Sequence, residues 1–234
     1  DKFLVESFGT IAAYGGTAAM MHYHATPEDH AVLEKKGFLL VDSGATYMDG
    51  TTDITRTYPL GPLTEDEKRF YTWTLQSHID LAKAVWLDYC ECKMIDTIAR
   101  EPLWRHRINY RCGTGHSVSF VGHVHEGPHA RNSRNTTRMR PGMVVTDEPG
   151  VYETDLVGIR IENELVCVHR ADDQYGTFLG FEPLTFVPIA TSPILPGVLD
   201  KDEIAWLNDY HRQVFAKLAP HLNDEERSWQ AEKC

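Results

Sequence analysis

The segment VDSGATYMDGTTDITRT, residues 41–57, predicts a β-hairpin that carries two carboxylates. An apolar run leads into it, the Asp49-Gly50 pair supplies turn chemistry, and the β-branched residues that follow favour a returning strand. Such a hairpin brings Asp42 and Asp53 onto neighbouring strands. Both lie in apolar surroundings, where a charge is costly unless it is paired or bound to a metal ion.

A second pair of carboxylates lies in the segments TDEPG and GIRIEN. We expect a hairpin that turns near residues 154–155 and places Glu148 roughly opposite Glu162. Side chains two residues apart on a strand share a face, so Arg160 should lie beside Glu162 and orient it. In a chain with 34 acidic residues one isolated pair carries little weight. The apolar flanks, as in GIRIENELVCV, are what favour a functional role.

A fifth candidate ligand is His116, in GTGH. Four carboxylates and one imidazole form an oxygen-rich set that suits two hard or borderline divalent ions such as Mn²⁺ better than a thiolate-preferring structural Zn²⁺. As catalytic ions, Zn²⁺ and Co²⁺ remain alternatives. The set predicts a two-metal hydrolase with the ligands Asp42, Asp53, His116, Glu148 and Glu162.

Composition and charge limit the possible classes of protein. The 234 residues contain no Ser/Gly/Pro-rich linker, so we expect a single domain over residues 1–234. A net charge of −11 argues against nucleic acid or a membrane surface as partner, because both require a basic face. Five cysteines without paired zinc spacing, and no signal peptide, favour a cytoplasmic protein. Because position 1 is Asp1 and not Met, we expect a piece of a longer chain that lacks an upstream helix or domain.

The remaining pattern predicts helices and strands of an α+β domain. Thr64 and Glu67 form a capping box that opens a long amphipathic helix. A shorter helix is expected over about residues 94–104, with Pro102 ending or kinking it. The segment RNSRNTTRMR, residues 131–140, is expected to be a solvated loop that could border an active-site mouth. The other predicted elements are strands over residues 117–125, 143–148 and 158–168 and a helix over residues 202–218.

The chain resembles a known family. The segments VDSGATYMDGTTDITRT, CGTGHSVSFVGHVHEGP, GMVVTDEPGVYE, GIRIENELVCV and FEPLTFVPI resemble, in order, the catalytic domain of Xaa-Pro aminopeptidases, in the eukaryotic cytosolic aminopeptidase P branch. The resemblance implies the pita-bread fold, a curved, mainly antiparallel sheet covered by helices, with two pseudo-related halves. Prolidase, methionine aminopeptidase and creatinase share this fold, so fold and ligands alone do not decide the substrate. VHEGP, TDEPG and FEPLT are the segments most specific to the aminopeptidase P branch.

The resemblance also implies how the five ligands divide between two ions. Asp42 and Asp53 would bind one ion, Asp53 would also reach the second, and His116, Glu148 and Glu162 would complete the pair, with Glu162 bridging. The family commonly works with Mn²⁺. Two ions roughly 3.5–4 Å apart can share a bridging water and hold the resulting hydroxide ready for attack on a carbonyl carbon.

The implied substrate is a peptide with proline in second position. Glu148 would act as general base and then general acid, and His22 in MMHY and His125 in VHEGP would contact the substrate and assist the reaction. Cys112 and Arg160 complete the expected substrate-contacting set. A homodimer is a further expectation, since relatives often pair through this domain.

The sequence departs from the family pattern at one informative position. Cys112 stands where the family usually has a histidine, four residues before His116, and Ser117 stands where a glycine is common. A thiol is a weaker hydrogen-bond donor than imidazole, so a substrate contact is either weakened or remade. The alternative is that Cys112 is an inert buried residue. Four other histidines are interpreted as ordinary polar residues, namely His24, His30, His123 and His129.

Two alternatives to an aminopeptidase stay open. The first keeps the chemistry and changes the substrate, giving a prolidase that cleaves only Xaa-Pro dipeptides. The second is a non-catalytic binding module of the same fold. Such modules usually lose metal ligands, whereas this chain keeps all five candidates.

Overall fold

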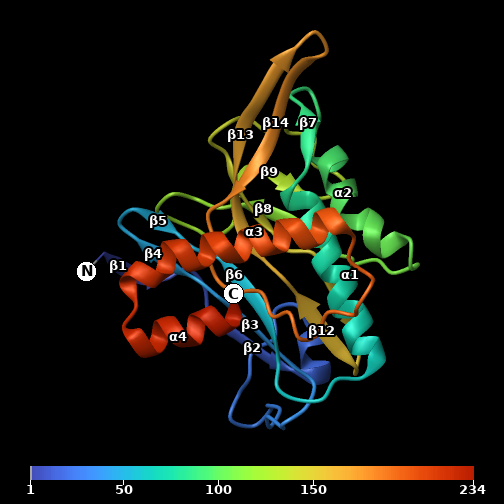
Figure 1. Cartoon of the computed structure of the whole chain (residues 1–234), viewed down its shortest axis with the longest axis vertical. Coiled ribbons are helices and arrows are strands. Elements are labelled where there is room, and N and C mark those ends of the chain that lie inside the picture. The colour runs from blue at the N-terminus through green and yellow to red at the C-terminus, as the bar shows by residue number, and fades with distance from the viewer. Residues whose placement is uncertain (1) are drawn as a thin grey trace.

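The computed structural model describes residues 2–234, whose strands form one six-stranded sheet and three smaller sheets (Figure 1). The strands are β1 (Phe3–Glu6), β2 (Ile11–Tyr14), β3 (Phe38–Ser43), β4 (Ala45–Tyr47), β5 (Gly50–Thr51), β6 (Ile54–Pro59), β7 (Val85–Leu87), β8 (Gly115–Ser117), β9 (Glu126–Arg131), β10 (Val144–Asp147), β11 (Gly150–Glu153), β12 (Val157–Arg160), β13 (Asn163–Asp173) and β14 (Gly176–Pro183). The helices are α1 (Glu65–Ala82), α2 (Cys92–Trp104), α3 (Lys201–Leu218) and α4 (Asp224–Lys233), with short 3-10 turns η1 (Gly15–Ala19) and η2 (Ala219–His221). The sheets have the orders β7-β14-β13-β10-β8-β9, β2-β3-β6, β1-β4-β5 and β11-β12.

The first predicted hairpin is present. Strands β3 and β6 pair antiparallel, with Asp42 opposite Thr55, and Asp53 directly precedes β6. The short strands β4 and β5 form the turn between them, with Thr46 opposite Thr51. The two carboxylates therefore lie on neighbouring chain segments, as the spacing predicts.

The second hairpin is present, but it is interrupted at its two carboxylates. Strands β10 and β13 pair on one side of the interruption, with Asp147 opposite Asn163, and β11 and β12 pair on the other. The predicted single strand over residues 158–168 is wrong at this point, because the backbone N–H of Glu162 donates to Thr55 of β6 and not to the hairpin partner. The N–H of Glu148 likewise donates to Thr114. Both carboxylates therefore lie where the ladder opens.

The predicted strand over residues 117–125 is wrong. Strand β8 ends at Ser117, the chain loops out, and β9 begins only at Glu126. The alternating apolar pattern is misleading because Phe120 and Val121 do not pack into the core, their side chains being 71% and 47% exposed.

The prediction of a solvated loop over residues 131–140 is wrong at Arg131 and at Met139, which are both buried. Arg131 pairs with Gly115 in the sheet and is fully buried, with its guanidinium 5.0 Å from the centre of the Phe181 ring. The register of β9 directs this side chain inward. Arg134 and Arg138 are exposed, as predicted.

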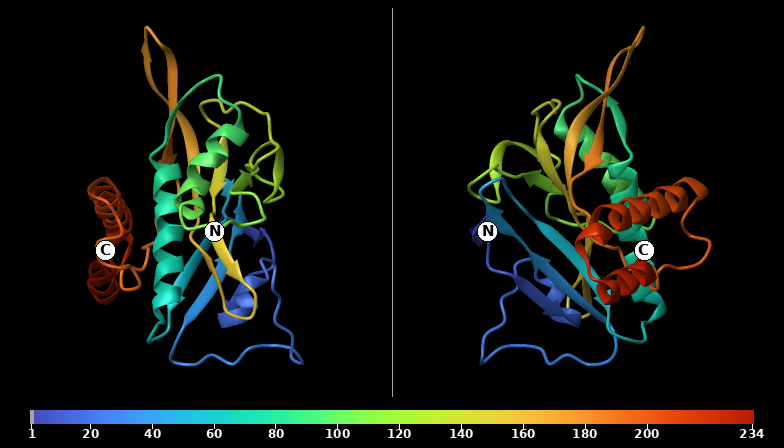
Figure 2. Two further views of the ribbon diagram at one scale, coloured as in Figure 1. Left: turned by 90° about the vertical axis from the view of Figure 1, so that its right-hand side faces the viewer. Right: turned by 60° about the vertical axis from the view of Figure 1, so that its left-hand side comes forward.

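The helices cover the strands from one side. Figure 2 shows α1 lying against the sheets, with α3 and α4 outside it. The capping box of α1 is formed by Thr64 and Glu67, as predicted. Pro102 lies inside α2, two residues before its end, and the predicted helix over 202–218 corresponds to α3. Helix α4 was not predicted. No helix within residues 2–234 is long and apolar enough to cross a bilayer.

Two large apolar clusters hold the hairpins against the helices. In one, the rings of Phe38 in β3 and Tyr71 in α1 stack with centres 5.4 Å apart, and Ile159 of β12 packs beside them. In the other, Ile95 of α2 packs against Leu165 of β13. Both carboxylate-bearing hairpins are thus attached to the helical layer through fully buried side chains, which makes them a rigid support for a site.

Candidate metal centre

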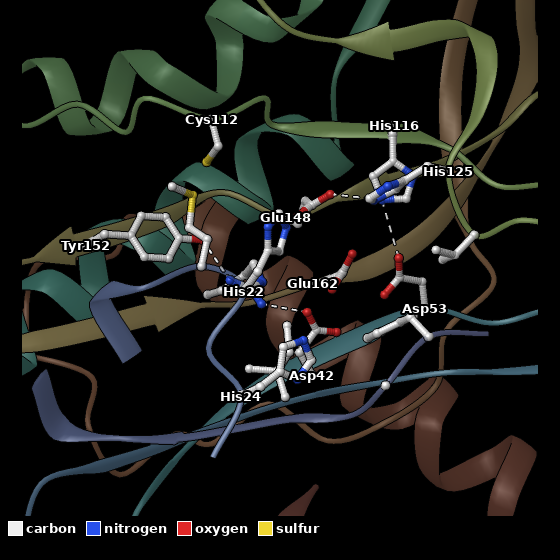
Figure 3. A pocket seen from close by; sticks show the side chains of 16 residues that line it. His22, His24, Asp42, Asp53, Cys112, His116, His125, Glu148, Tyr152 and Glu162 are labelled. Atoms are coloured by element: carbon white, nitrogen blue, oxygen red, sulfur yellow. Dashed lines mark hydrogen bonds and ion pairs between the residues drawn. The ribbon is translucent and has the colours of Figure 1, made fainter. Parts of the chain in front are cut away.

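The five predicted ligands line one cavity of ≈ 220 Å³ (Figure 3). They come from five separate chain segments: β3, the turn before β6, β8, and the two interruptions of the second hairpin. One ligand atom each from Asp53, His116 and Glu162 lies within 4.8 Å of the others. His116 Nε2 is 3.4 Å from Asp53 Oδ2 and 3.3 Å from Glu148 Oε1. The arrangement therefore gathers oxygen and nitrogen ligands at cation-binding distances.

Hydroxyl and guanidinium groups hold the carboxylates from outside. Thr55 donates from Oγ1 to Glu162 Oε2 at 2.6 Å, and Thr146 donates to Glu148 Oε1 at 2.8 Å. Arg160 donates from Nη2 to Asp42 Oδ2 at 2.6 Å and from Nε to Thr55. Arg160 thus contacts Asp42 directly and is linked to Glu162 through Thr55. Arg160 reaches across to the first hairpin because both hairpins face the same cavity.

Burial and mutual repulsion disfavour the charged forms of these carboxylates. Burial, together with the charges of Asp42 and Glu148, raises the pKa of Asp53 to about 6. Burial raises the pKa of Glu162 well above its ordinary value, and it raises the pKa of Asp42 in spite of Arg160. Clustered carboxylates with raised pKa values are typical of sites that bind cations.

The donor set fits two divalent ions. Asp42 Oδ1 and Glu162 Oε1 are buried and have no hydrogen-bond partner within residues 2–234. An unpaired buried carboxylate oxygen is costly, and a metal ion relieves that cost. The ring of His116 receives its orientation from Nδ1, which lies 3.0 Å from the carbonyl of Ser117 and leaves Nε2 for the cavity.

The expected substrate-contacting residues also line the cavity. His22 follows η1, and His125 directly precedes β9. The rings of His116 and His125 meet edge to face with centres 4.1 Å apart. Burial and the neighbouring His116 lower the pKa of His125, so its ring is neutral near pH 7.

Cys112 lies at the edge of the same cavity (Figure 3). Burial and the charge of Glu148 raise the pKa of the Cys112 thiol to about 11, so it stays protonated at neutral pH. Its carbonyl accepts a hydrogen bond from Arg100. The thiol is therefore a neutral, weakly polar part of the wall.

Sequence reasoning missed two polar residues of the cavity wall. His24, interpreted as an ordinary polar residue, lines it two positions after His22. Tyr152 also lines it and accepts a hydrogen bond from Arg160 at 3.0 Å. No local pattern marks Tyr152, since its contact is with the opposite strand of the hairpin.

A buried polar bridge lies behind the second hairpin. His78 of α1 has Nδ1 3.3 Å from Asp147 Oδ2 and Nε2 3.3 Å from Asn163 Nδ2. Asp147 directly precedes the candidate ligand Glu148, and Asn163 directly follows the candidate ligand Glu162. One histidine thus connects the backbone of both ligands to the helical layer.

Arg56 of β6 extends this bridge. It donates to the carbonyl of Glu162, to Asn163 Oδ1 at 2.7 Å and to the hydroxyl of Tyr210 in α3 at 3.0 Å. Arg56 is 3% exposed, and its guanidinium donates to oxygen acceptors only. These contacts tie the interruption of the second hairpin to the first hairpin and to α3.

Four carboxylates and an imidazole around one cavity, most of them held by hydrogen bonds or ion pairs to neighbouring groups, form a candidate metal centre of the kind that metallohydrolases use. The chain belongs to metallopeptidase family M24. The sequence pattern of this family matches residues 2–169, and that of the C-terminal region of peptidase M24 matches residues 177–234. The fold is accordingly the pita-bread fold, and the resemblance to aminopeptidase P is confirmed.

Similar proteins are consistent with this assignment. The chain is 40% identical to a probable Xaa-Pro aminopeptidase P of Coprinopsis cinerea, over 97% of this chain and 38% of that protein. It is 42% identical to aminopeptidase P2 of Arabidopsis thaliana, over 95% of this chain and 32% of that protein. A solved X-prolyl aminopeptidase of Caenorhabditis elegans, described as a cytosolic enzyme with a di-nuclear active site, matches with a TM-score of 0.95 and 38% identity, over 100% of this chain and 39% of that one. The chain thus spans less than two fifths of the length of these relatives.

Proposed function

We propose that residues 1–234 form the single catalytic domain of a metallo-aminopeptidase that hydrolyses the bond between an N-terminal residue and a penultimate proline. The observation that carries the proposal is the convergence of Asp42, Asp53, His116, Glu148 and Glu162 on one cavity. The aminopeptidase P names of the relatives support the substrate class.

The five residues would hold two divalent ions, for which we propose Mn²⁺, with Zn²⁺ and Co²⁺ as alternatives. Bound there, the ions would supply a water of lowered pKa and polarise the scissile carbonyl. The oxygen-rich donor set supports Mn²⁺, because carboxylates suit hard cations.

The protein's own residues would manage the protons. Glu148, held at Oε1 by Thr146, would accept a proton from the attacking water and deliver it to the proline nitrogen as the bond breaks. His125, neutral near pH 7, would donate from a ring N–H to the carbonyl oxygen as charge develops on it. His22 lines the same cavity and would contact the substrate beside it. Arg160 would act on the substrate only through Asp42, since its guanidinium is engaged in the wall.

A proline-specific site answers a particular chemical difficulty. The proline nitrogen carries no hydrogen and its ring restricts φ, so general aminopeptidases bind such a bond poorly. The cavity wall combines polar groups with the apolar side chains of Phe8, Ile11 and Met21. These supply a surface against which a pyrrolidine ring can pack.

Prolidase activity is the alternative, because a prolidase of Pyrococcus furiosus shares the fold, with a TM-score of 0.68 and 28% identity over 80% of this chain. The test is a length series with the full-length protein and Mn²⁺, using Xaa-Pro, Xaa-Pro-Yaa and longer peptides. Cleavage of the longer peptides supports the aminopeptidase, and cleavage of the dipeptide alone supports the prolidase. Failure to bind metal and to cleave any of them would support a non-catalytic module.

A cytoplasmic location and a homodimer remain proposals for this chain. The first is supported by the cytosolic description of the Caenorhabditis elegans relative. The second rests on the resemblance alone, and the mass of the full-length protein in solution tests it.

A further inference from the structure

Charge is distributed very unevenly along this chain. Residues 100–140 contain eight arginines and only two acidic residues, Glu101 and Glu126, and no lysine, which makes the segment +6. The whole chain is −11. Arg100 and Arg131 are buried, but the other six arginines are exposed and give the segment a basic surface suited to an anion.

Part of this basic segment lines a second cavity of ≈ 570 Å³, here called the arginine cavity. It adjoins the catalytic cavity, because Cys112 lines both. Neither the cavity beside Tyr14 nor the cavity beside Phe120 shares a lining residue with the catalytic one. Figure 3 shows Cys112 at the edge of the site, away from Asp53. The two cavities therefore share part of their walls at Cys112.

The cavity presents two unengaged cations. Arg111 and Arg134 line it and are exposed, and within residues 2–234 neither guanidinium forms an ion pair. Arg100 lies deeper and is engaged, donating to Asp96, Asn109 and two backbone carbonyls. The charge of Arg100 is compensated by Asp96, so Arg111 and Arg134 are the cations of this cavity that remain available for a ligand.

We propose that the arginine cavity binds the anionic part of a peptide substrate beyond its proline, either the terminal α-carboxylate or an Asp or Glu side chain. This inference rests on the proposed function. An aminopeptidase holds the N-terminus of its substrate at the metal centre, so the rest of the peptide must leave the catalytic cavity. Arg111 and Arg134 attract a carboxylate there and repel a lysine or arginine side chain. The side chains of Asn132 and Ser133, which also line the cavity, offer hydrogen bonds to the same group.

The test compares tetrapeptides that differ only in terminal charge, with the full-length, Mn²⁺-loaded protein. Ala-Pro-Gly-Glu, Ala-Pro-Gly-Gln and Ala-Pro-Gly-Lys are each supplied as the free acid and as the amide. We expect kcat/KM to fall in that order and from acid to amide, mainly through KM. Exposed ion pairs are weak, so each arginine should account for about a two- to fivefold difference. The preference for the acidic peptide should decline when the salt concentration is raised from about 0.05 to about 0.5 M, because salt screens the attraction between exposed charges.

Arg111→Gln and Arg134→Gln should each reduce the preference for the acidic peptide, and the double variant should abolish it. Arg105→Gln is the matched control, because Arg105 is exposed in the same basic segment, pairs with Glu101 and lines neither cavity. Equal kcat/KM for the Glu and Lys peptides, or equal loss of preference in Arg105→Gln, overturns the proposal.

Binding of product peptides separates this proposal from the proposed function. Calorimetry with Pro-Gly-Glu and Pro-Gly-Lys requires no turnover. If no peptide is cleaved but Pro-Gly-Glu binds more tightly through Arg111 and Arg134, the subsite stands and the aminopeptidase proposal fails. If peptides are cleaved without regard to charge, and a short RNA instead binds through the same two arginines, the peptide subsite is overturned in favour of a nucleic-acid surface.

Discussion

Arg160 and Asp42, 118 residues apart in the chain, form a buried ion pair with Nη2 2.6 Å from Oδ2. The pair joins the two carboxylate-bearing hairpins across the candidate metal centre. It also leaves the second oxygen of Asp42, Oδ1, without a protein partner and available to a cation. The geometry of the centre therefore depends on a contact between its two halves.

Replacing Arg160 should weaken the fold and the metal site together. Arg160→Met leaves Asp42 buried without its partner, which should lower the free energy of unfolding by about 3–5 kcal/mol. Urea unfolding and Mn²⁺ titration of the purified protein measure the two effects. Arg170→Met is the control, because Arg170 and Glu182 form an exposed pair that should change stability by less than about 1 kcal/mol. Unchanged Mn²⁺ affinity in Arg160→Met would contradict the role given to this pair.

Metal content should distinguish ligands from substrate-contacting residues. Asp53→Ala and Glu162→Ala should lose bound metal and all turnover, whereas His125→Ala should retain metal and slow turnover on the order of 10²-fold or more. Elemental analysis and rate measurements on the same preparations test this. Loss of both ions from His125→Ala would place that residue among the ligands instead.

The metal-free protein should lose stability as pH rises. The pKa of Asp53 is raised from 3.8 to about 6 in the folded state, so the folded protein binds this proton more tightly than the unfolded chain does. The stabilisation is fully present below pH 3.8 and is lost as pH rises through about 6. Thermal unfolding in chelator over this range, compared with Asp53→Asn, isolates the contribution of this one group.

Added Mn²⁺ should reverse that dependence, because metal binding requires deprotonated carboxylates. The midpoint of thermal unfolding should then rise between about pH 5 and 7. A metal-free protein whose stability follows the same pH profile as Asp53→Asn would contradict the raised pKa of Asp53, whose largest cause is burial.

His78 should affect metal affinity without touching the metal. It connects Asp147 and Asn163, the neighbours of two candidate ligands, so His78→Gln should weaken Mn²⁺ affinity by about 10- to 100-fold. His211→Gln is the control, since His211 is equally buried and accepts from the N–H of Ile189, away from the centre. Both variants should lose some stability, but only His78→Gln should change the affinity. Equal Mn²⁺ affinities in the two variants would show that His78 contributes to stability alone.

The thiol of Cys112 should be dispensable. Because its pKa is raised to about 11, it is neither a nucleophile nor a metal ligand at neutral pH, so Cys112→Ser should keep its metal and turn over within about threefold of the parent. Cys112→His should increase kcat, since imidazole is the stronger hydrogen-bond donor. Steady-state kinetics on both variants decide the matter, and a Cys112→Ser enzyme without activity would show that the thiol has a chemical role.

Local patterns predicted much of this molecule correctly. The turn at Asp49-Gly50, the capping box of α1 and the β-branched run after Asp53 are each local signals, and each element is present. Four of the five candidate ligands are carboxylates in apolar surroundings, a local context that indicates burial, and the fifth is His116. Their convergence on one cavity follows from the two hairpins that carry four of them.

The errors lie where distant segments compete for the same backbone or side-chain groups. The strand over residues 158–168 is interrupted because Glu162 bonds to Thr55, and Arg131 is buried by the register of β9 on β8. No pattern in the neighbouring residues predicts either contact.

By itself the sequence determined most of the elements and the chemical kinds of candidate ligand, because turns, helix caps and apolar periodicity act over a few residues. Only the tertiary structure decided which oxygen each supporting group holds and that Cys112 lines two cavities. It also decided that His78 contacts Asp147 of β10 and Asn163 of β13, next to two candidate ligands. Those outcomes depend on pairings between residues far apart in the chain, where a shift of one residue in a strand turns a side chain to the opposite face.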